Sequence, residues 1–188
     1  MPDYNNMPQN KDFGHLMDCI ASDLFHGAAW HGAAANAMRN IGLRGFGRLH
    51  EYNAAHDFTK RLELEKILCD RLGLTPEIDV ADIGHALAVT LGGPAELKPH
   101  LEAWLNSERE FAALLTEAVA MAAGVDLCVY EKLTCILAAV QEEVMRVKML
   151  KKRLELGGYS GHDMGVISMM IHEQMENHPE LGMDFNLG

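Results

Sequence analysis

The chain has 188 residues and a net charge of −11, with 16 Lys and Arg against 27 Asp and Glu. This length suits one sizeable core and demands no second domain. The acidic balance argues against nucleic acid and against an anionic membrane surface as partners, because no basic run is available to neutralise phosphates. An acidic protein is better suited to binding cations.

The cysteines and the N-terminal segment bear on the expected cellular compartment. The four cysteines lie far apart and form no CxxC pair, which predicts reduced, mostly buried thiols rather than a zinc site or a disulfide framework. The first 16 residues carry neither the basic nor the apolar segment of a signal peptide. No run approaches the roughly 18 apolar residues of a membrane span. We therefore expect a soluble, cytoplasmic protein with no membrane partner.

Helical periodicity dominates the chain. Ala, Leu, Met and Glu recur, apolar residues step by three and four, and no strand alternation is found, so the sequence predicts an all-α protein. We expect a flexible tip (1–12), one folded region (13–177) and a flexible tail (178–188). The expected helices are about 13–40, 45–72, 95–123 and 126–157, a short one near 80–91, and a methionine-rich one at about 161–177.

The connections between the helices predict how they are arranged. Only "AGVD" separates the helices at 95–123 and 126–157, so these two should be antiparallel neighbours. The connection from Gly73 to Glu96 is long enough to cross the length of a bundle. Two hairpins of long helices joined by a long crossover, with a short C-terminal helix after them, predict a ferritin-like four-helix bundle.

Charged residues interrupt apolar stripes that should face a core. Asp57 and Lys60 do so in one helix, and Glu143, with Arg146 three residues later, does so in another. Buried carboxylates are costly unless they meet a metal ion or a cation. Four helices that each supply an inward carboxylate are typical of di-iron proteins, in which two helices also give a histidine three residues after the acid. The other two helices offer Asp23 and, on its apolar stripe, Glu108.

Two runs carry a resemblance to a known family. "MRNIGLRGFGRLHEYNAAHDFTKRLELEKIL" and "AAVQEEVMRVKMLKKRLELGGY" resemble the first-to-second-helix region and the fourth helix of bacterioferritins, over roughly residues 14–157. The resemblance implies a ferritin-like fold, iron handling or storage, and a homo-oligomer, a dimer or larger. It places the two Glu-x-x-His motifs of that family on Asp57 to Lys60 and on Glu143 to Arg146. Its third-helix carboxylate falls on Glu110, whereas the apolar stripe prefers Glu108, and its first-helix ligand falls on Leu24, beside Asp23.

The differences between this sequence and the bacterioferritin motifs affect whether a metal ion can bind. Lysine and arginine are protonated at pH 7 and have no lone pair for a metal ion, so Lys60 and Arg146 remove both nitrogen ligands. Their charges could instead neutralise two carboxylates and replace a divalent ion. Both pairs also fit ordinary i,i+3 ion pairs on a helix surface. The haem-binding methionine of the family falls on Phe58, so no haem is expected.

Histidines at new positions could restore a metal site. His26 forms an Asp-x-x-His pair with Asp23, and His56 is adjacent to Asp57, which suggests a displaced site that also includes Glu143. We rank four other histidines lower: His15, His31, His50 and His100. A weaker resemblance links Gly45 to Tyr52 with the Phe-x-x-Leu-His-Glu run of mini-ferritins. The methionines near the C-terminus predict packing or a subunit contact rather than a copper or haem site.

Three hypotheses follow. The first is a ferritin-like bundle with an altered carboxylate site that binds iron or another divalent metal, with ferroxidase-type activity only if iron still binds. The second is a metal-free bundle in which Lys60 and Arg146 replace the metal and the protein acts by assembly or partner binding. The third is a small-molecule carrier that uses the bundle core.

Overall fold

The computed structural model of the protein describes residues 8–81 and 83–177. The expected tail (178–188) and the first seven residues of the expected tip lie outside these residues. The described residues form helices and loops without a strand, so the prediction of an all-α protein is confirmed. The elements are α1 (Pro8–Asn40), α2 (Arg44–Leu72), α3 (Ile83–Leu87), the 3-10 helix η2 (Pro94–Glu96), α4 (Leu97–Ala122), α5 (Leu127–Leu156) and α6 (Gly161–Asn177).

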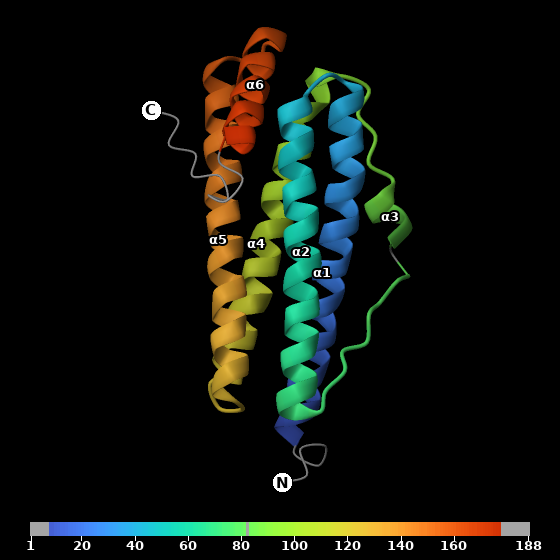
Figure 1. Ribbon diagram of the computed structural model, residues 1–188, viewed down its shortest axis with the longest axis vertical. Helices are drawn as coiled ribbons and strands as arrows, with labels where there is room; N and C mark the ends of the chain where they lie inside the picture. Colours follow the sequence, from blue (N-terminus) through green and yellow to red (C-terminus); the bar gives the residue numbers. More distant parts are fainter. Residues whose placement is uncertain (1–7, 82, 178–188) are drawn as a thin grey trace.

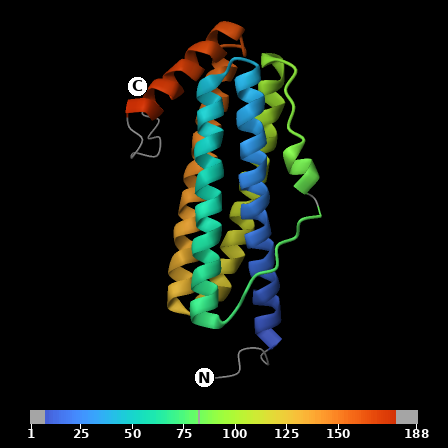
Figure 2. The same cartoon turned by 45° about the vertical axis from the view of Figure 1, so that its right-hand side comes forward.

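The four long helices form one bundle (Figure 1). α1 packs against α2 and α4, and α5 packs against α2 and α4. The predicted pairing into two antiparallel hairpins is therefore confirmed. The connection after α2 returns along the outside of α1, with α3 against that helix, and enters α4 at the far end of the bundle (Figure 2).

Local chemistry fixes the helix ends close to their predicted positions. α2 ends at Gly73, whose φ of 67° lies in the left-handed region that glycine adopts without strain. α5 begins after Asp126, whose carboxylate accepts hydrogen bonds from the backbone N–H groups of Cys128 and Val129. Two bounds differ from expectation, since α1 begins at Pro8 and the short helix of the crossover covers only Ile83–Leu87.

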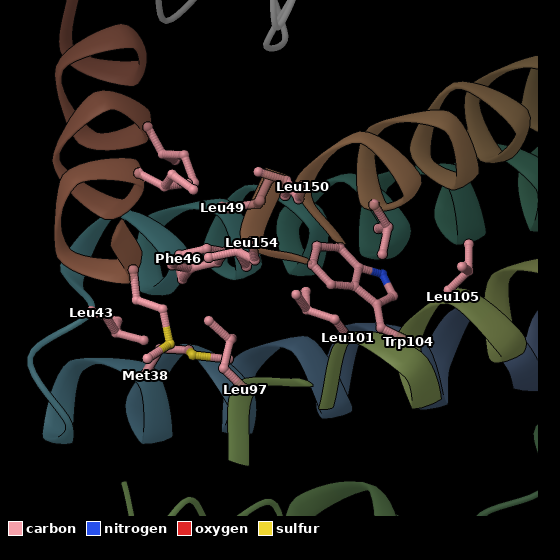
Figure 3. Packing of buried hydrophobic residues seen from close by; sticks show 14 of the residues in the cluster. Met38, Leu43, Phe46, Leu49, Leu97, Leu101, Trp104, Leu105, Leu150 and Leu154 are labelled. Atoms are coloured by element: carbon pink, nitrogen blue, oxygen red, sulfur yellow. The ribbon is translucent and has the colours of Figure 1, made fainter. Parts of the chain in front are cut away.

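The core consists of two apolar clusters, one toward each end of the bundle. The first joins residues of all four long helices with α6 and includes Phe46, Leu101 and Leu150 (Figure 3). The second includes Phe13, Leu64 and other residues of the opposite end. On every long helix the two clusters are separated by a short segment that carries polar residues, so a polar layer lies across the middle of the bundle.

α6 covers the end of the bundle that holds the first cluster. It lies across the start of α2 (Figure 2) and buries Met164, Ile167 and Ile171. The contact depends on Gly45, whose N–H donates to the Ser168 hydroxyl at 2.9 Å. A Cβ at this position would lie 1.8 Å from the Ser168 carbonyl oxygen, so only glycine permits this approach.

Two expectations about side chains and one about the membrane can be compared with the structure. The expectation of mostly buried thiols is wrong, because two cysteines are intermediate and two exposed, although all four are free. Packing by the C-terminal methionines holds for Met164, whereas Met169 is exposed. Among the described helices, none is long and apolar enough to cross a membrane.

Candidate metal centre

The middle of the bundle holds a layer of buried polar side chains. α1 supplies His31, α2 supplies Asp57 and Lys60, and α5 supplies Glu143, each of them buried. α4 supplies Glu108, whose side chain is 13% exposed. Each residue lies between the two apolar clusters on its helix, so water is largely kept from the charges.

His31 stands at the centre of three carboxylates. Its Nε2 lies 3.5 Å from Glu143 Oε1, 3.9 Å from Glu108 Oε1 and 4.0 Å from Asp57 Oδ2. One ligand atom each from His31, Glu108 and Glu143 fall within 4.8 Å of one another. These three residues form the one such group of potential metal ligands among the described residues.

Asp57 and Lys60 form a buried ion pair beside this group. The Lys60 ammonium donates to Asp57 Oδ1 at 3.2 Å, and the two residues are 5% and 7% exposed. Across from them, Gly27 of α1 leaves room for the carboxylate, since a Cβ there would lie 3.0 Å from Asp57 Oδ2. The pair brings one negative and one positive charge into the layer, so it does not offset the charge of the two glutamates.

Glu143 is held by neutral donors. Asn53 Nδ2 donates to its Oε1 at 2.6 Å, and Trp104 Nε1 donates to the same oxygen at 3.1 Å. These contacts come from α2 and α4, so the carboxylate is fixed from two neighbouring helices. Arg146, three residues later, is buried but forms no ion pair with Glu143 among the described side chains.

The surroundings of the two glutamates oppose ionisation of their carboxyls. Burial raises the pKa of Glu108 to about 8, and the Asp57 carboxylate adds to this rise. Burial, followed by repulsion from Glu108, likewise raises the pKa of Glu143 to about 8. The His31 imidazole has its pKa lowered by burial, so it is neutral at pH 7 and has a lone pair to give. Without a cation, the two carboxyls hold protons to a much higher pH than exposed glutamates do.

A further set of histidine and tryptophan rings packs beside His31. His31 Nδ1 is 2.8 Å from His50 Nδ1, and His50 Nε2 is 3.1 Å from His100 Nε2. Trp30 stacks on His100 with ring centroids 4.8 Å apart, and Trp104 packs on His50 at 4.5 Å. The three histidines are buried and come from α1, α2 and α4.

The structure brings several of the sequence-predicted site residues together. Asp57, Lys60 and Glu143 lie in the central layer, and the ion pair between Asp57 and Lys60 exists. Between the two alternatives on α4, Glu108 approaches His31, whereas Glu110 is exposed.

The remaining predicted residues lie farther from the centre. Asp23, His26 and Glu110 line a cavity of about 350 Å³ that also reaches His31 and Glu108. The pKa of Asp23 is raised by desolvation, opposed by His26 and aided by Glu110. His56 is exposed and stacks on Tyr52 with ring centroids 5.4 Å apart.

Ranking His31, His50 and His100 below His26 and His56 missed the buried histidines. The buried positions of α1 include Leu24, His31 and Ala34, whereas the apolar spacing of this helix suggested a stripe through Asp23 and Trp30. A shift of one residue therefore put Asp23 in the place of Leu24 and Trp30 in the place of His31.

The donor set fits one metal ion better than two. One imidazole nitrogen and two carboxylate oxygens suit a first-row divalent ion such as Fe²⁺, Mn²⁺ or Zn²⁺. A second ion beside Asp57 would meet the Lys60 ammonium, which repels cations and has no lone pair.

Comparisons with known proteins support the fold. No family model and no curated protein matches the sequence. An open-pore ferritin from the hyperthermophilic archaeon Archaeoglobus fulgidus superposes with a TM-score of 0.72 at 15% identity, covering 86% of this chain and 96% of that chain. An engineered closed form of the A. fulgidus ferritin gives 0.69 at 16% identity, covering 86% and 94%. A humanized archaeal ferritin also gives 0.69 at 16%, covering 86% and 95%. The protein therefore has a ferritin-like fold, and its nearness to bacterioferritins stays a prediction.

Proposed function

We propose that the protein binds one divalent metal ion in the central layer, through His31, Glu108 and Glu143, and that iron is its biological ion. The observation that carries this proposal is the convergence of the three ligand atoms within 4.8 Å of one another. The ferritin-like fold adds iron handling as the role, since the similar structures are ferritins.

The charge of the layer supports a single divalent ion. Lys60 neutralises Asp57, which leaves Glu108 and Glu143 without a compensating cation. Burial raises the pKa of both to about 8, and repulsion between neighbouring carboxylates adds to the rise. One divalent ion would balance two carboxylates and would bind the neutral His31 through its Nε2 lone pair. Fe²⁺ held in this way would supply a redox-active centre with open coordination positions.

Anaerobic titration with Fe(II), with metal counted per chain, tests the proposal. We expect one bound ion per chain in the wild type, and at least tenfold weaker binding in Glu108→Gln and Glu143→Gln because each variant removes a charged ligand. Glu117→Gln, an exposed site on the same helix as Glu108, is the matched control and should bind as the wild type does.

The same titration decides between the two carboxylates on α4. If Glu110→Gln weakened binding more than Glu108→Gln, the site would lie farther along the cavity than we propose. Admitting oxygen after loading and following its consumption would show whether the bound iron is oxidised. An absence of bound iron in the wild type would contradict the proposal.

The buried ion pair between Asp57 and Lys60 favours one alternative function, that of a metal-free bundle. An ion pair that already satisfies part of the layer is compatible with a metal-free bundle that acts through assembly or a partner. Under that alternative, Glu108 and Glu143 stay protonated at neutral pH and no divalent ion binds. The cytoplasmic location and the homo-oligomer expected from the sequence stay predictions, and a native mass of more than one chain would bear out the latter.

A further inference from the structure

Three imidazoles form a continuous hydrogen-bonded chain that leads away from the candidate metal centre. His31 has Nε2 toward the carboxylates and Nδ1 toward His50, at 2.8 Å from its Nδ1. His50 then reaches His100 through its other nitrogen, with 3.1 Å between the two Nε2 atoms. His31 and His50 therefore each have both ring nitrogens engaged.

Each of the two N···N contacts in this chain needs an N–H on one ring and a lone pair on the other, so His50, which makes both contacts, carries one N–H. A neutral imidazole donates from one nitrogen and accepts at the other. The N–H groups of the three rings must then all point the same way along the chain, because two facing N–H groups or two facing lone pairs would leave a buried contact without a hydrogen bond.

We propose that His50 and His100 are positioning residues for the metal centre, which hold His31 in the tautomer whose Nε2 lone pair faces Glu108 and Glu143. This inference rests on the proposed function. With a metal ion on Nε2, the proton of His31 sits on Nδ1 and is donated to His50 Nδ1. His50 must then carry its proton on Nε2 and donate it to His100 Nε2. A second imidazole that accepts the remaining N–H of a ligating histidine fixes both its tautomer and its orientation.

The surrounding indoles keep the rings in place. Trp30 stacks on His100 with an interplanar angle of 8°, and it meets His31 and His50 edge-on at 5.0 Å and 5.5 Å between centroids. Trp104 packs on His50 and also donates to Glu143. A flip of any of these rings would have to displace an indole, so the chain is a rigid support rather than a mobile one.

The same geometry argues against a second metal site formed by the three histidines. Two nitrogens that bind one tetrahedral zinc ion at about 2.0 Å lie roughly 3.3 Å apart, more than the 2.8 Å between His31 and His50. His50 also uses different nitrogens toward its two neighbours. The three rings consequently converge on no common point.

Zinc provides the probe, because it is diamagnetic and accepts the same ligands. We would compare the wild type, His50→Leu, His50→Asn and a control, His162→Asn, an exposed histidine of α6. Zinc affinity is measured by competition with a chelator, and ¹⁵N NMR reads the tautomers. Leucine removes the acceptor for His31, so we expect affinity to fall about 10- to 100-fold. The asparagine side-chain oxygen takes the place of Nδ1, so His50→Asn should lose much less.

The NMR readout is one that a packing role alone would not change. In the zinc-loaded wild type we expect protons on Nδ1 of His31 and on Nε2 of His50, and in His50→Leu we expect the His31 tautomer to become mixed in the metal-free protein. If His50→Leu bound zinc as tightly as the wild type, or if both His50 variants lost affinity equally while staying helical, the positioning role would be refuted and the metal site retained. A wild type that binds no zinc and no iron would refute the proposed function and this inference together.

Discussion

At the scale of single residues, Lys60 bears on how many metal ions the proposed centre would accept. Its ammonium lies 3.2 Å from Asp57 Oδ1, with both residues almost fully buried. A protonated lysine cannot ligate a metal, and its charge lowers the attraction of the neighbouring carboxylates for a cation. The residue thus makes Asp57 a partner of Lys60 rather than a free ligand.

Replacing Lys60 by methionine separates these two effects. We expect the metal-free Lys60→Met protein to lose about 3–5 kcal/mol of unfolding free energy, because a buried carboxylate remains without its partner. We also expect Fe(II) to bind about tenfold more tightly, because the repelling cation is gone. Urea unfolding and anaerobic titration measure the two quantities.

The exposed pair between Lys66 and Asp70 on the same helix is the matched control. Lys66→Met removes a cation that is 76% exposed, so its effect on stability should be far smaller than that of Lys60→Met. Equal affinity for iron in Lys60→Met and in the wild type would mean that the Lys60 charge does not act on the site.

The site was partly predictable at this scale, and the reason differs from residue to residue. Asp57, Lys60 and Glu143 were found because each breaks an apolar stripe, and burial of a charge needs a compensating partner. His31 was missed because imidazole occurs both in cores and on surfaces, so its presence in "HGAAWHGAAANA" breaks no pattern. The contacts of His50 and His100 depend on packing between α1, α2 and α4, which no local pattern encodes.

At the scale of the elements, α1 has a small residue where it faces Asp57 of α2. Gly27 and Gly32 both lie within α1, and each should cost the helix about 1 kcal/mol relative to alanine. Their surroundings differ, because a Cβ at Gly27 would lie 3.0 Å from Asp57 Oδ2 whereas one at Gly32 would meet nothing within 4 Å. The first glycine therefore serves the site, and the second is a matched control on the same helix.

Alanine at these two positions should have different consequences. We expect Gly32→Ala to raise the unfolding free energy by about 0.5–1 kcal/mol through helix propensity alone. Gly27→Ala should gain nothing and weaken Fe(II) binding, because its methyl group pushes Asp57 toward the other carboxylates. Thermal unfolding and iron titration measure both effects. Equal stabilisation by the two variants would show that Asp57 moves aside without cost.

The elements themselves were largely predictable from the sequence, for local reasons. Gly73 ends α2 and Asp126 caps α5 where expected, because these residues satisfy the backbone groups of the helix ends. The short helix of the crossover was overestimated, since five helical residues hold little intrinsic stability and its bounds depend on contact with α1. The packing of α6 against Gly45 also could not be predicted, because it depends on a contact between residues far apart in the chain.

At the scale of the whole molecule, the polar layer makes stability depend on pH. The pKa values of Glu108 and Glu143 are about 8 in the folded protein, well above the value of 4.5 for an exposed glutamate. The folded state thus binds more protons than the unfolded state between these values, and stability falls as pH rises through that range. The histidines act in the other direction only below pH 6.5, since burial lowers the pKa of His31, His50 and His100 below it.

The interval from pH 6.5 to 8 therefore isolates the two glutamates. Between these limits we expect the metal-free protein to lose about 3 kcal/mol of unfolding free energy, since each of the two carboxyls keeps most of a proton and one retained proton corresponds to about 1.4 kcal/mol per pH unit. Glu108→Gln should flatten the slope, because a neutral amide replaces one titrating group and removes its repulsion of Glu143. With saturating Fe(II) the slope should nearly vanish, because the metal-bound folded state and the unfolded state then both carry ionised carboxylates over this range. Urea unfolding at pH 6.5, 7.25 and 8, with and without metal, measures all three effects. A metal-free wild type whose stability stays constant over this range would contradict the prediction. It would show that Lys60 and the neutral donors already neutralise the carboxylates.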